Sequence, residues 1–451
     1  MPVLWFGQIP PDALWARLRQ KDSLEPISTS LRVVLAKPMK IAVEASSWHN
    51  RRGYGRHTRS LFSALAELAA PHELEFITDG DRSEIQLDCP VRVVSVKTSE
   101  PAVEALRAGG SRSIADLWRM SRELSAREYD VVIFPTVCNY VPVSTRARKI
   151  VFQHDAIVEE YPHLTMTSRK ERFFWEAKTR MAHIQADHLV TVSKYSKSIL
   201  ANKFPRLSSR IEVIGEAPSR IFRKLDDSKI TDSLRATSIC WDRPILLYVG
   251  GISPHKNLIR LAEAFAIATE KAPLQNAQLV FVGATDTEKY VSCLEQLRDV
   301  CREHRISDRT VFAGYLSDED LNILYNRATA LAIPSLMEGY GLPAVEAAVA
   351  GCPVIATRNG ATPEVLGDAA LYVDPLNTHE IAEAMERTLR SESLRRQMSH
   401  EGGKATRHLT WLHPAKALLD LVERQGDHTL VDKEASFIPT PMESKGPWQP
   451  T

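Results

Sequence analysis

Two glutamates, a glycine-containing turn and a helix start lie together in the segment PSLMEGYGLPAVEAAVAG, residues 334–351. The apolar run from Thr329 to Ile333 predicts a buried strand before the turn, and Pro343 is typical of the first position of a helix. The free amides of Gly341 and Leu342, together with the helix dipole, would favour a phosphate at that helix start. The pattern therefore predicts an anion site between a strand and a helix.

Seven residues separate Glu338 from Glu346, which places one carboxylate in the turn and the other one turn into the helix. Both can then face the same cleft. Because carboxylates repel a diphosphate but accept hydrogen bonds from hydroxyls, we expect Glu346 to bind a ribose diol and Glu338 a sugar ring. In the alternative interpretation, Glu346 only complements the helix dipole and Glu338 is a solvated loop charge.

The run PSLMEGYGLPAVEA, followed by GCPVIAT and TPEVLGDAALYVDP, closely resembles the donor-binding segment of the retaining glycosyltransferases of family 4. The resemblance extends from about Lys40 to about Glu423. It implies the GT-B fold, an α/β architecture of two Rossmann-like domains that face each other across a cleft, with a C-terminal helix that crosses back to the first domain. It also implies that Glu338, Tyr340 and Glu346 bind a nucleotide-diphosphate sugar, which is a substrate, so that no cofactor is expected.

The composition of the 451 residues, 44% hydrophobic and 25% charged with a net charge of +1, is that of a globular chain of two or three domains without general affinity for nucleic acid. The six cysteines have neither zinc-site spacing nor histidine companions and indicate no disulfide framework, so a reducing, cytoplasmic compartment fits best. No stretch is long enough to span a bilayer, and Pro10, Pro11 and Asp12 interrupt the N-terminus before a signal peptide develops.

Domain boundaries follow from the same pattern. Residues 1–38 precede the first predicted strand and stay unassigned. Residues 39–241 are expected to form the N-terminal, acceptor-binding domain, and residues 242–409 the C-terminal domain that binds the nucleotide sugar. Residues 410–425 are expected to form the crossover helix, and residues 426–451, with four prolines and little apolar material, a disordered tail.

The N-terminal domain is predicted to begin with a strand at 40–45 and a helix at 57–68, followed by strands at 73–78, 91–96 and 131–135 with a helix at 114–125 before the last. The loop after the first strand contains Gly53 and Gly55, which allow close backbone approach to a diphosphate, and Arg56, which adds a charge. A dinucleotide fingerprint would need a third glycine where Thr58 stands. The resemblance implies that this loop faces the donor phosphates, whereas chain reversal alone is the alternative.

His154 and Asp155 follow a strand that ends at Gln153, where a parallel sheet opens its functional edge. The resemblance implies an active-site histidine beside the transferred sugar at this position, although a lone histidine is more often structural. The next predicted helix, 168–185, interleaves cations with aromatic residues at 173–175. It is expected either to contact an anionic membrane that carries a lipid-linked acceptor or to be an ordinary surface helix.

The second domain opens with PILLYVGGISPHKNLIRLAEAF, a strand, a glycine turn and a helix with Asn257 as N-cap. Lys256 at the positive end of that helix costs about 0.3 to 1 kcal/mol unless an anion binds there. The resemblance implies that Lys256 contacts the donor phosphates together with an arginine five residues earlier. That position is Gly251 here, so either His255 replaces the arginine or the phosphate is held more weakly.

Three further segments complete the site analysis. The resemblance implies that the backbone at Tyr315 and Leu316 borders the nucleobase. Most relatives have an asparagine-glycine turn where this chain has EAPSRIFRK, which leaves the role of Glu216 open. The acidic runs 79–81 and 318–320 are interpreted as a turn and as the cap and first turn of a helix rather than as metal motifs, so no metal site is expected.

The sequence therefore predicts a retaining, metal-independent hexosyltransferase. GYGRHTRSL, HDAI and ISPHKN are most like mannosyltransferases of bacterial surface-polysaccharide assembly, so GDP-mannose is the first donor expected, with a glycan or lipid-linked acceptor and no nucleic-acid partner. The alternatives are a UDP-hexose donor with a small soluble acceptor, and a catalytically silent nucleotide-sugar-binding protein. His154 and Glu338 are the predicted catalytic residues; Gly53, Gly55, Lys256, Tyr340, Gly341, Leu342 and Glu346 are predicted to bind the donor, with Arg56, Asp155, His255 and Leu316 as further candidates.

Overall fold

The computed structural model describes residues 38–50, 53–89, 91–99, 113–226, 238–271, 273–283 and 292–424. The unassigned residues before 38 and the expected disordered tail from 426 lie outside these ranges. Within them, no helix is both long and apolar enough to cross a bilayer.

The N-terminal half contains a seven-stranded sheet in the order β3-β2-β1-β4-β5-β6-β7, in which all neighbouring strands are parallel. The strands are β1 (Lys40–Glu44), β2 (Glu73–Thr78), β3 (Arg92–Ser95), β4 (Val131–Phe134), β5 (Arg148–Phe152), β6 (His188–Thr191) and β7 (Ile211–Val213). The helices are α2 (Gly53–Leu68), α4 (Ile114–Ala126), α5 (Ile157–Glu160), α6 (Pro162–Thr165), α7 (Arg169–Gln185) and α8 (Lys194–Lys203). Parallel strands joined by helices need cover on both faces, and the alternating side chains of β1 divide accordingly: Ile41 and Val43 pack with α2, and Ala42 with α4, α7 and α8.

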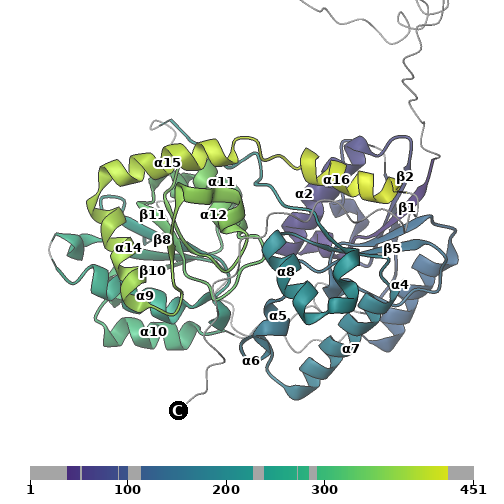
Figure 1. The fold of residues 1–451 in the computed structure, drawn as a ribbon, viewed down its shortest axis with the longest axis horizontal. Helices are drawn as coiled ribbons and strands as arrows, with labels where there is room; N and C mark the ends of the chain where they lie inside the picture. Colours follow the sequence, from purple (N-terminus) through teal and green to yellow (C-terminus); the bar gives the residue numbers. More distant parts are fainter. Residues whose placement is uncertain are drawn as a thin grey trace, which may run out of the picture. The chain divides into compact units, whose positions relative to one another are not determined.

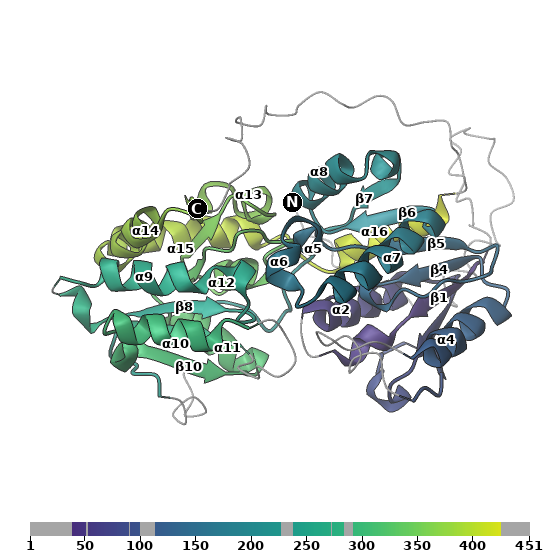
Figure 2. The ribbon, with the colours of Figure 1, turned by 90° about the horizontal axis from the view of Figure 1, so that it is seen from below.

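The C-terminal half repeats this plan in a six-stranded parallel sheet, in the order β10-β9-β8-β11-β12-β13. Its strands are β8 (Ile245–Val249), β9 (Gln278–Val282), β10 (Thr310–Gly314), β11 (Ala330–Ile333), β12 (Val354–Thr357) and β13 (Ala370–Val373). Its helices are α9 (Leu258–Ala268), α10 (Leu294–Glu303), α11 (Asp318–Arg327), α12 (Leu342–Val349), α13 (Thr362–Leu366), α14 (Thr378–Arg390) and α15 (Glu392–Thr406), followed by α16 (Leu412–Glu423) (Figures 1 and 2).

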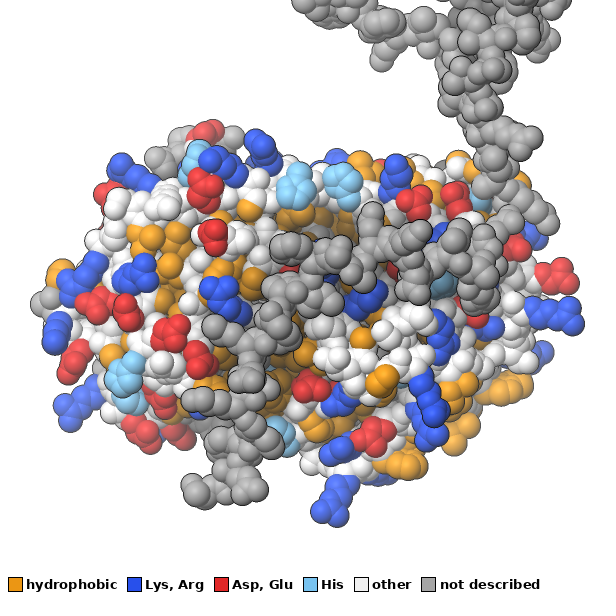
Figure 3. Space-filling view, viewed as in Figure 1, with side chains coloured by type: hydrophobic (Ala, Val, Ile, Leu, Met, Phe, Trp, Pro, Cys, Tyr) orange, Lys and Arg blue, Asp and Glu red, His pale blue; other side chains and the backbone are white. Residues whose placement is uncertain are grey.

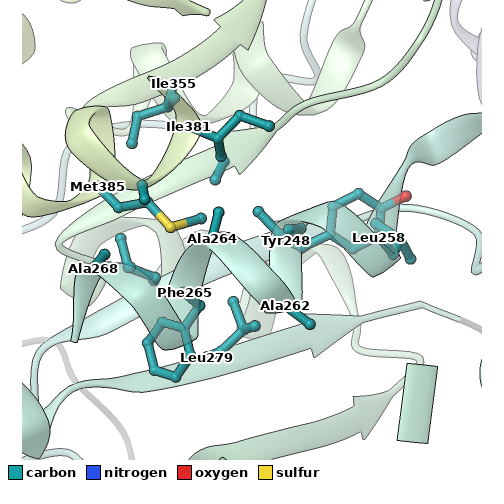
Figure 4. Packing of buried hydrophobic residues seen from close by; sticks show 14 of the residues in the cluster. Tyr248, Leu258, Ala262, Ala264, Phe265, Ala268, Leu279, Ile355, Ile381 and Met385 are labelled. Atoms are coloured by element: carbon teal, nitrogen blue, oxygen red, sulfur yellow. The ribbon is translucent and has the colours of Figure 1, made fainter. Parts of the chain in front are cut away.

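Small residues line the packing of α14 against α9 in this half. Figure 4 shows Met385 of α14 beside Ala264 and Ala268 of α9, over a sheet surface that includes Leu279. The alanines let the two helices approach, and the flexible thioether of Met385 fills the remaining space. The result is a rigid base beneath the loops that leave β8 and β11.

Both sheets reverse their strand order next to the first strand, between β1 and β4 in one and between β8 and β11 in the other. In open parallel sheets, ligands bind outside the carboxyl ends of the strands at such a switch point. The two Rossmann-like sheets that the sequence predicted are thus confirmed. The expected ligand loops are those that follow β1, β4, β8 and β11.

The C-terminal helix α16 packs against α2, the first α-helix among the described residues of the N-terminal half (Figure 1). Its residues Leu418, Leu421 and Val422 are buried with Phe62 in one apolar cluster. His72 also contacts Glu423 at 2.9 Å. The helix that was predicted to cross back to the first domain is therefore confirmed.

Three predictions about local structure were wrong. Helix α2 begins at Gly53 rather than at His57, so Gly53 and Gly55 belong to a helical turn and not to a loop. A side chain at Gly55 would lie 1.7 Å from the carbonyl oxygen of Asn50, so this glycine serves the packing of the preceding chain against the helix. Asn257 does occupy the N-cap position of α9, but the capping expected of its side chain is not made; its side-chain amide donates to the carbonyls of Pro334 and Pro375 instead.

Candidate active site

The loops at the two switch points line one cavity of about 340 Å3. This cavity brings together side chains and backbone from both halves of the chain. Eight of the predicted site residues line it, namely Gly53, His154, Asp155, Lys256, Glu338, Tyr340, Gly341 and Leu342. Gly55, Arg56, His255, Leu316 and Glu346 lie outside its lining.

The start of α12 has the geometry expected of an anion site. Gly341 adopts the left-handed conformation, with φ of 81°, immediately before the first helical residue, Leu342. A glycine accepts this conformation without the strain that a Cβ would bring. The hydrogen-bond ladder of α12 begins with the amide of Ala344, which donates to the carbonyl oxygen of Gly341 at 2.9 Å. The amides of Gly341 and Leu342 precede this ladder, and both residues line the cavity together with Pro343, which has no amide hydrogen to satisfy.

Lys256 and Glu338 form an ion pair in the cavity wall. The ammonium group of Lys256 donates to both carboxylate oxygens, at 2.8 and 2.9 Å, and the hydroxyl of Ser335 donates to Oε1 at 2.6 Å. Burial acts to raise the pKa of Glu338, but the charge and hydrogen bonds of Lys256 outweigh it and hold the pKa below the ordinary value. The cation expected at the phosphates is thus neutralised by the carboxylate expected at the sugar.

Glu346 is fully buried and already bonded. Its Oε1 accepts from Arg56 at 2.5 Å and its Oε2 from the hydroxyl of Tyr325 at 3.3 Å. Burial raises the pKa of Glu346 to about 7, against the opposing charge of Arg56. Arg56 also pairs with Asp318, in the acidic first turn of α11, and its guanidinium group lies 5.6 Å from the ring of Phe222.

The sequence did not anticipate that Arg56 and Glu346 are partners. Arg56 was expected over the phosphates and Glu346 at the ribose, and 290 positions separate them in the chain. Asp318 was correctly assigned to the first turn of a helix, but its contact with Arg56 was missed. These contacts show that a residue of α2 reaches the first turn of α11 and the second turn of α12 in the C-terminal half.

His255 supplies no positive charge. Burial and the neighbouring charge of Lys256 lower the pKa of His255 to about 3, so the ring is neutral. Its carbonyl accepts from the amide of Leu336 at 2.9 Å, so the residue braces the turn that carries Glu338. Gly251 leaves room for a longer side chain, since the nearest atom to a Cβ there would be Ser253 Oγ at 3.7 Å.

Leu316 lies between β10 and α11 and packs against the apolar cluster under that helix, while Tyr315 beside it is exposed.

Asp155 lies in the wall of the cavity. Its Oδ1 accepts from the amide of Ile157, and burial raises the pKa of Asp155 above the ordinary value. A side chain on Gly339 would lie 3.1 Å from the Cβ of Asp155, so the close approach of the two loops depends on that glycine.

His154 belongs to a buried group that sequence reasoning missed in part. Its Nε2 lies 2.9 Å from the carbonyl oxygen of Pro135, and its Nδ1 lies 3.5 Å from Glu216 Oε1. His57 Nδ1 lies 2.8 Å from the same oxygen. The unusual turn at Glu216 was a sequence signal for this residue, but nothing in the helical pattern singled out His57.

Comparison with known proteins identifies related families for both halves of the chain. The family described as Glycosyltransferase Family 4 matches residues 51–216, and Glycosyl transferases group 1 matches residues 232–405. Mannosylfructose-phosphate synthase of Agrobacterium fabrum is 29% identical over 182 residues, a match that spans only 40% of this chain and 40% of the relative. O-antigen chain mannosyltransferase B of Escherichia coli is 27% identical over 371 residues, which cover 80% of this chain and 92% of the relative.

Among solved structures, a sucrose-phosphate synthase from Thermosynechococcus elongatus superimposes with a TM-score of 0.66 at 19% identity, over 85% of this chain and 98% of the other. That likeness shows the same overall fold, the GT-B fold. The two family matches together span most of the chain and divide it as its two sheets do. The chain therefore belongs to the group 1 glycosyltransferases of family 4, which use nucleotide-sugar donors and retain the anomeric configuration.

Proposed function

We propose that this protein transfers a hexose, in the first instance mannose from GDP-mannose, to a glycan or lipid-linked acceptor in surface-polysaccharide assembly. The observation that carries the proposal is the single cavity in which Lys256 and the start of α12 meet His154 and Asp155 of the other half. A cation and free helix amides suit a diphosphate, while the carboxylates and the histidine suit sugar hydroxyls.

In the proposed complex, the diphosphate lies at the start of α12 beside Lys256. The residues Gly53, Tyr340, Gly341 and Leu342 surround it, and Glu346 accepts from the ribose. Arg56 has to leave Glu346 for this to happen, and the diphosphate is then its natural partner. Gly55 has no place in this contact because it faces Asn50.

Sugar transfer follows a front-face route in this proposal. A retaining glycosidase sets two carboxylates across the bond that breaks, whereas Glu338 and Glu346 are each held by a cation here. The leaving diphosphate therefore accepts the proton of the acceptor hydroxyl, and Lys256 and the helix amides stabilise the charge that develops. His154 and Glu338 position the sugar. No metal ion is assigned a role in these steps.

The choice of mannose and of a polysaccharide acceptor is supported by the likeness to O-antigen chain mannosyltransferase B over most of both chains. The alternative acceptor is a small soluble sugar phosphate, with a UDP-hexose as the alternative donor. Its support is that mannosylfructose-phosphate synthase and sucrose-phosphate synthase are both named for phosphorylated sugars. A catalytically silent nucleotide-sugar-binding protein is the third candidate, favoured by Gly251 at the position where relatives carry an arginine.

Peripheral contact with an anionic membrane is part of the proposal for a lipid-linked acceptor, in a cytoplasmic enzyme. On α7, Phe173 is 66% exposed and Ile184 is 70% exposed, which is unusual for such residues. Figure 3 shows hydrophobic side chains interspersed with Lys and Arg over this part of the molecule, at the lower right. Apolar side chains among cations are the pattern that binds an anionic lipid surface.

Calorimetric titration with GDP, UDP and ADP in the presence of EDTA tests the donor site. The wild type should bind one of them selectively, and Lys256→Ala should bind it at least tenfold more weakly. Lys404→Ala, which removes a lysine from an exposed ion pair with Glu401, is the matched control and should bind normally. Hydrolysis of the matching nucleotide sugar then separates an enzyme from a silent binding protein. If the protein bound none of the three diphosphates, the proposal would be wrong.

A further inference from the structure

Two histidines share one carboxylate at the wall of the cavity. His57 comes from α2, His154 follows β5, and Glu216 follows β7; all three are more than nine-tenths buried. Glu216 Oε1 lies 2.8 Å from His57 Nδ1 and 3.5 Å from His154 Nδ1. Glu216 and His154 also line the cavity of the proposed sugar site.

The hydrogen bonds fix which atoms of His154 carry protons. Its Nε2 faces the carbonyl oxygen of Pro135, which can only accept, so this nitrogen is protonated. A neutral ring would then turn the lone pair of Nδ1 towards the carboxylate of Glu216. A second proton on Nδ1 would remove that repulsion and form a buried ion pair, and the carboxylate of Glu216 is placed to be its counter-ion.

His57 is the neutral member of the group. Burial would raise the pKa of Glu216, but the neighbouring ring of His154 and the hydrogen bond with His57 lower it to about 2, so the carboxylate is charged and His57 Nδ1 must donate to it. Burial and the neighbouring His154 lower the pKa of His57. The two rings are only 4.4 Å apart, and two charged rings at that distance would repel each other.

A metal ion is the alternative occupant. Among the residues that the structure describes, these three form the one group whose ligand atoms, all within 4.8 Å of one another, could close on a metal ion. The 2.8 Å separation is a hydrogen-bond distance, however. A metal on His57 Nδ1 would also move the ring proton to Nε2, which is buried and has no partner. The geometry therefore favours protons.

A second buried histidine shows the contrast. His72 Nε2 lies 2.9 Å from Glu423 Oε1, but its Nδ1 lies 3.2 Å from the amide of Met39 and has to accept. That ring needs only one proton to satisfy both partners. His154 differs because both of its partners are acceptors.

We propose that Glu216 is the counter-ion of a doubly protonated His154, and that this pair, with His57 as the second donor to Glu216, holds the ring in position for sugar transfer. The inference rests on the proposed function for its catalytic part. Glu216 is also tied to the donor turn, since the hydroxyl of Tyr340 donates to its carbonyl oxygen at 2.5 Å. The titratable groups that interact with His154 are Tyr54 and His57 on α2, its neighbour Asp155, and Glu216. Cys138, Lys256 and Glu338 line the same cavity.

The test follows the titration of individual histidine rings by NMR in protein labelled at histidine, with His154→Gln and His72→Gln to assign the two signals. In Glu216→Gln the midpoint of the His154 titration should move to lower pH by about one unit or more, because the opposite charge is lost. In His57→Phe it should move to higher pH, because Glu216 then serves His154 alone. Glu423→Gln is the matched control and should leave the His154 signal unchanged.

The activity arm measures nucleotide-sugar turnover against pH. The alkaline limb of kcat should move to lower pH in Glu216→Gln by the same amount as the NMR midpoint, with KM for the donor unchanged. An NMR shift in a protein that turns over no nucleotide sugar supports the ion pair while the proposed function fails. An unmoved NMR midpoint in both variants, or one zinc ion per chain whose removal by EDTA alters the His154 signal, overturns the ion pair. If the NMR midpoint of His154 shifts in Glu216→Gln while the alkaline limb of kcat stays in place, the catalytic role of the ion pair is overturned.

Discussion

Replacement of Glu346 by glutamine should stabilise the protein in the absence of donor, although the sequence predicts that Glu346 binds the donor. Its carboxylate is fully buried, and burial raises its pKa from 4.5 to about 7 even with Arg56 beside it. The folded state therefore binds this proton more tightly than the unfolded chain does. The stability that the neutral form provides is fully present below pH 4.5 and is lost as the pH rises to about 7.

The size of this effect follows from the shift. At about 1.4 kcal/mol for each pH unit, a shift of roughly 2.5 units corresponds to about 3 kcal/mol. Glutamine keeps the shape and an acceptor oxygen for Arg56 but carries no charge. We therefore expect Glu346→Gln to match the wild type near pH 4.5 and to exceed it by about 3 kcal/mol at pH 8, which is on the order of 6–12 °C in Tm for a domain of this size.

Thermal unfolding of both proteins between pH 3 and 8 measures the difference. Glu338→Gln is the matched control with the opposite sign: Lys256 and the hydrogen bonds lower the pKa of Glu338, so its charge stabilises the fold above pH 4.5. Glu338→Gln should therefore be less stable than the wild type at neutral pH, and the difference should disappear as the pH falls below 4.5. Two results would refute the reasoning. One is a difference in stability between Glu346→Gln and the wild type that does not change with pH, and the other is a Glu346→Gln protein that is less stable than the wild type at pH 8.

Three further predictions concern the start of α12, Arg56 and the buried face of α16. Gly341→Ala should cost about 1–2 kcal/mol in thermal stability and weaken nucleotide binding because of the left-handed φ, whereas Gly403→Ala, in the interior of α15 with open space around it, should be neutral or stabilising. Arg56→Met should weaken diphosphate binding about tenfold in calorimetry, and adding Gly251→Arg to that variant should restore much of the binding. If the double variant bound as weakly as Arg56→Met alone, a phosphate role for Arg56 would be contradicted. Leu418→Ala, in the buried face of α16, should destabilise the protein by about 2–5 kcal/mol in urea unfolding, and the half-exposed Leu412→Ala should not.

The sequence was most informative where the signal is local. The buried parallel strand β4 is a continuous apolar run, and its limits and those of β2 agree with the predictions to within one residue. The start of α2 was misplaced because glycine has a low helix propensity, which the contact of Gly55 with Asn50 overrides. Helix α15 was not predicted, since its few apolar residues and the pair Gly402 and Gly403 leave only a weak helical pattern.

The partners of the site residues had no local signal at all. Residue types and spacing predicted donor-binding roles for Glu338, Glu346 and Lys256, because a turn and a helix start define their surroundings within a few positions. The pairing of Glu346 with Arg56 joins residues 290 positions apart, and that of His57 with Glu216 joins residues 159 positions apart. Such contacts depend on how the two sheets present their loops, which no periodicity in the chain encodes.

These pairings change how donor binding has to be understood. Each carboxylate assigned to a donor hydroxyl is held by a cation assigned to the donor phosphates: Glu338 by Lys256, and Glu346 by Arg56. Binding is then an exchange of partners, in which the diphosphate takes the cations and the hydroxyls take the carboxylates. A ligand that offers only phosphates leaves buried carboxylates without donors, and one that offers only hydroxyls leaves the cations in place. The intact nucleotide sugar alone satisfies both sets of charges, so in this proposal the selectivity for the donor resides in the ion pairs that it replaces.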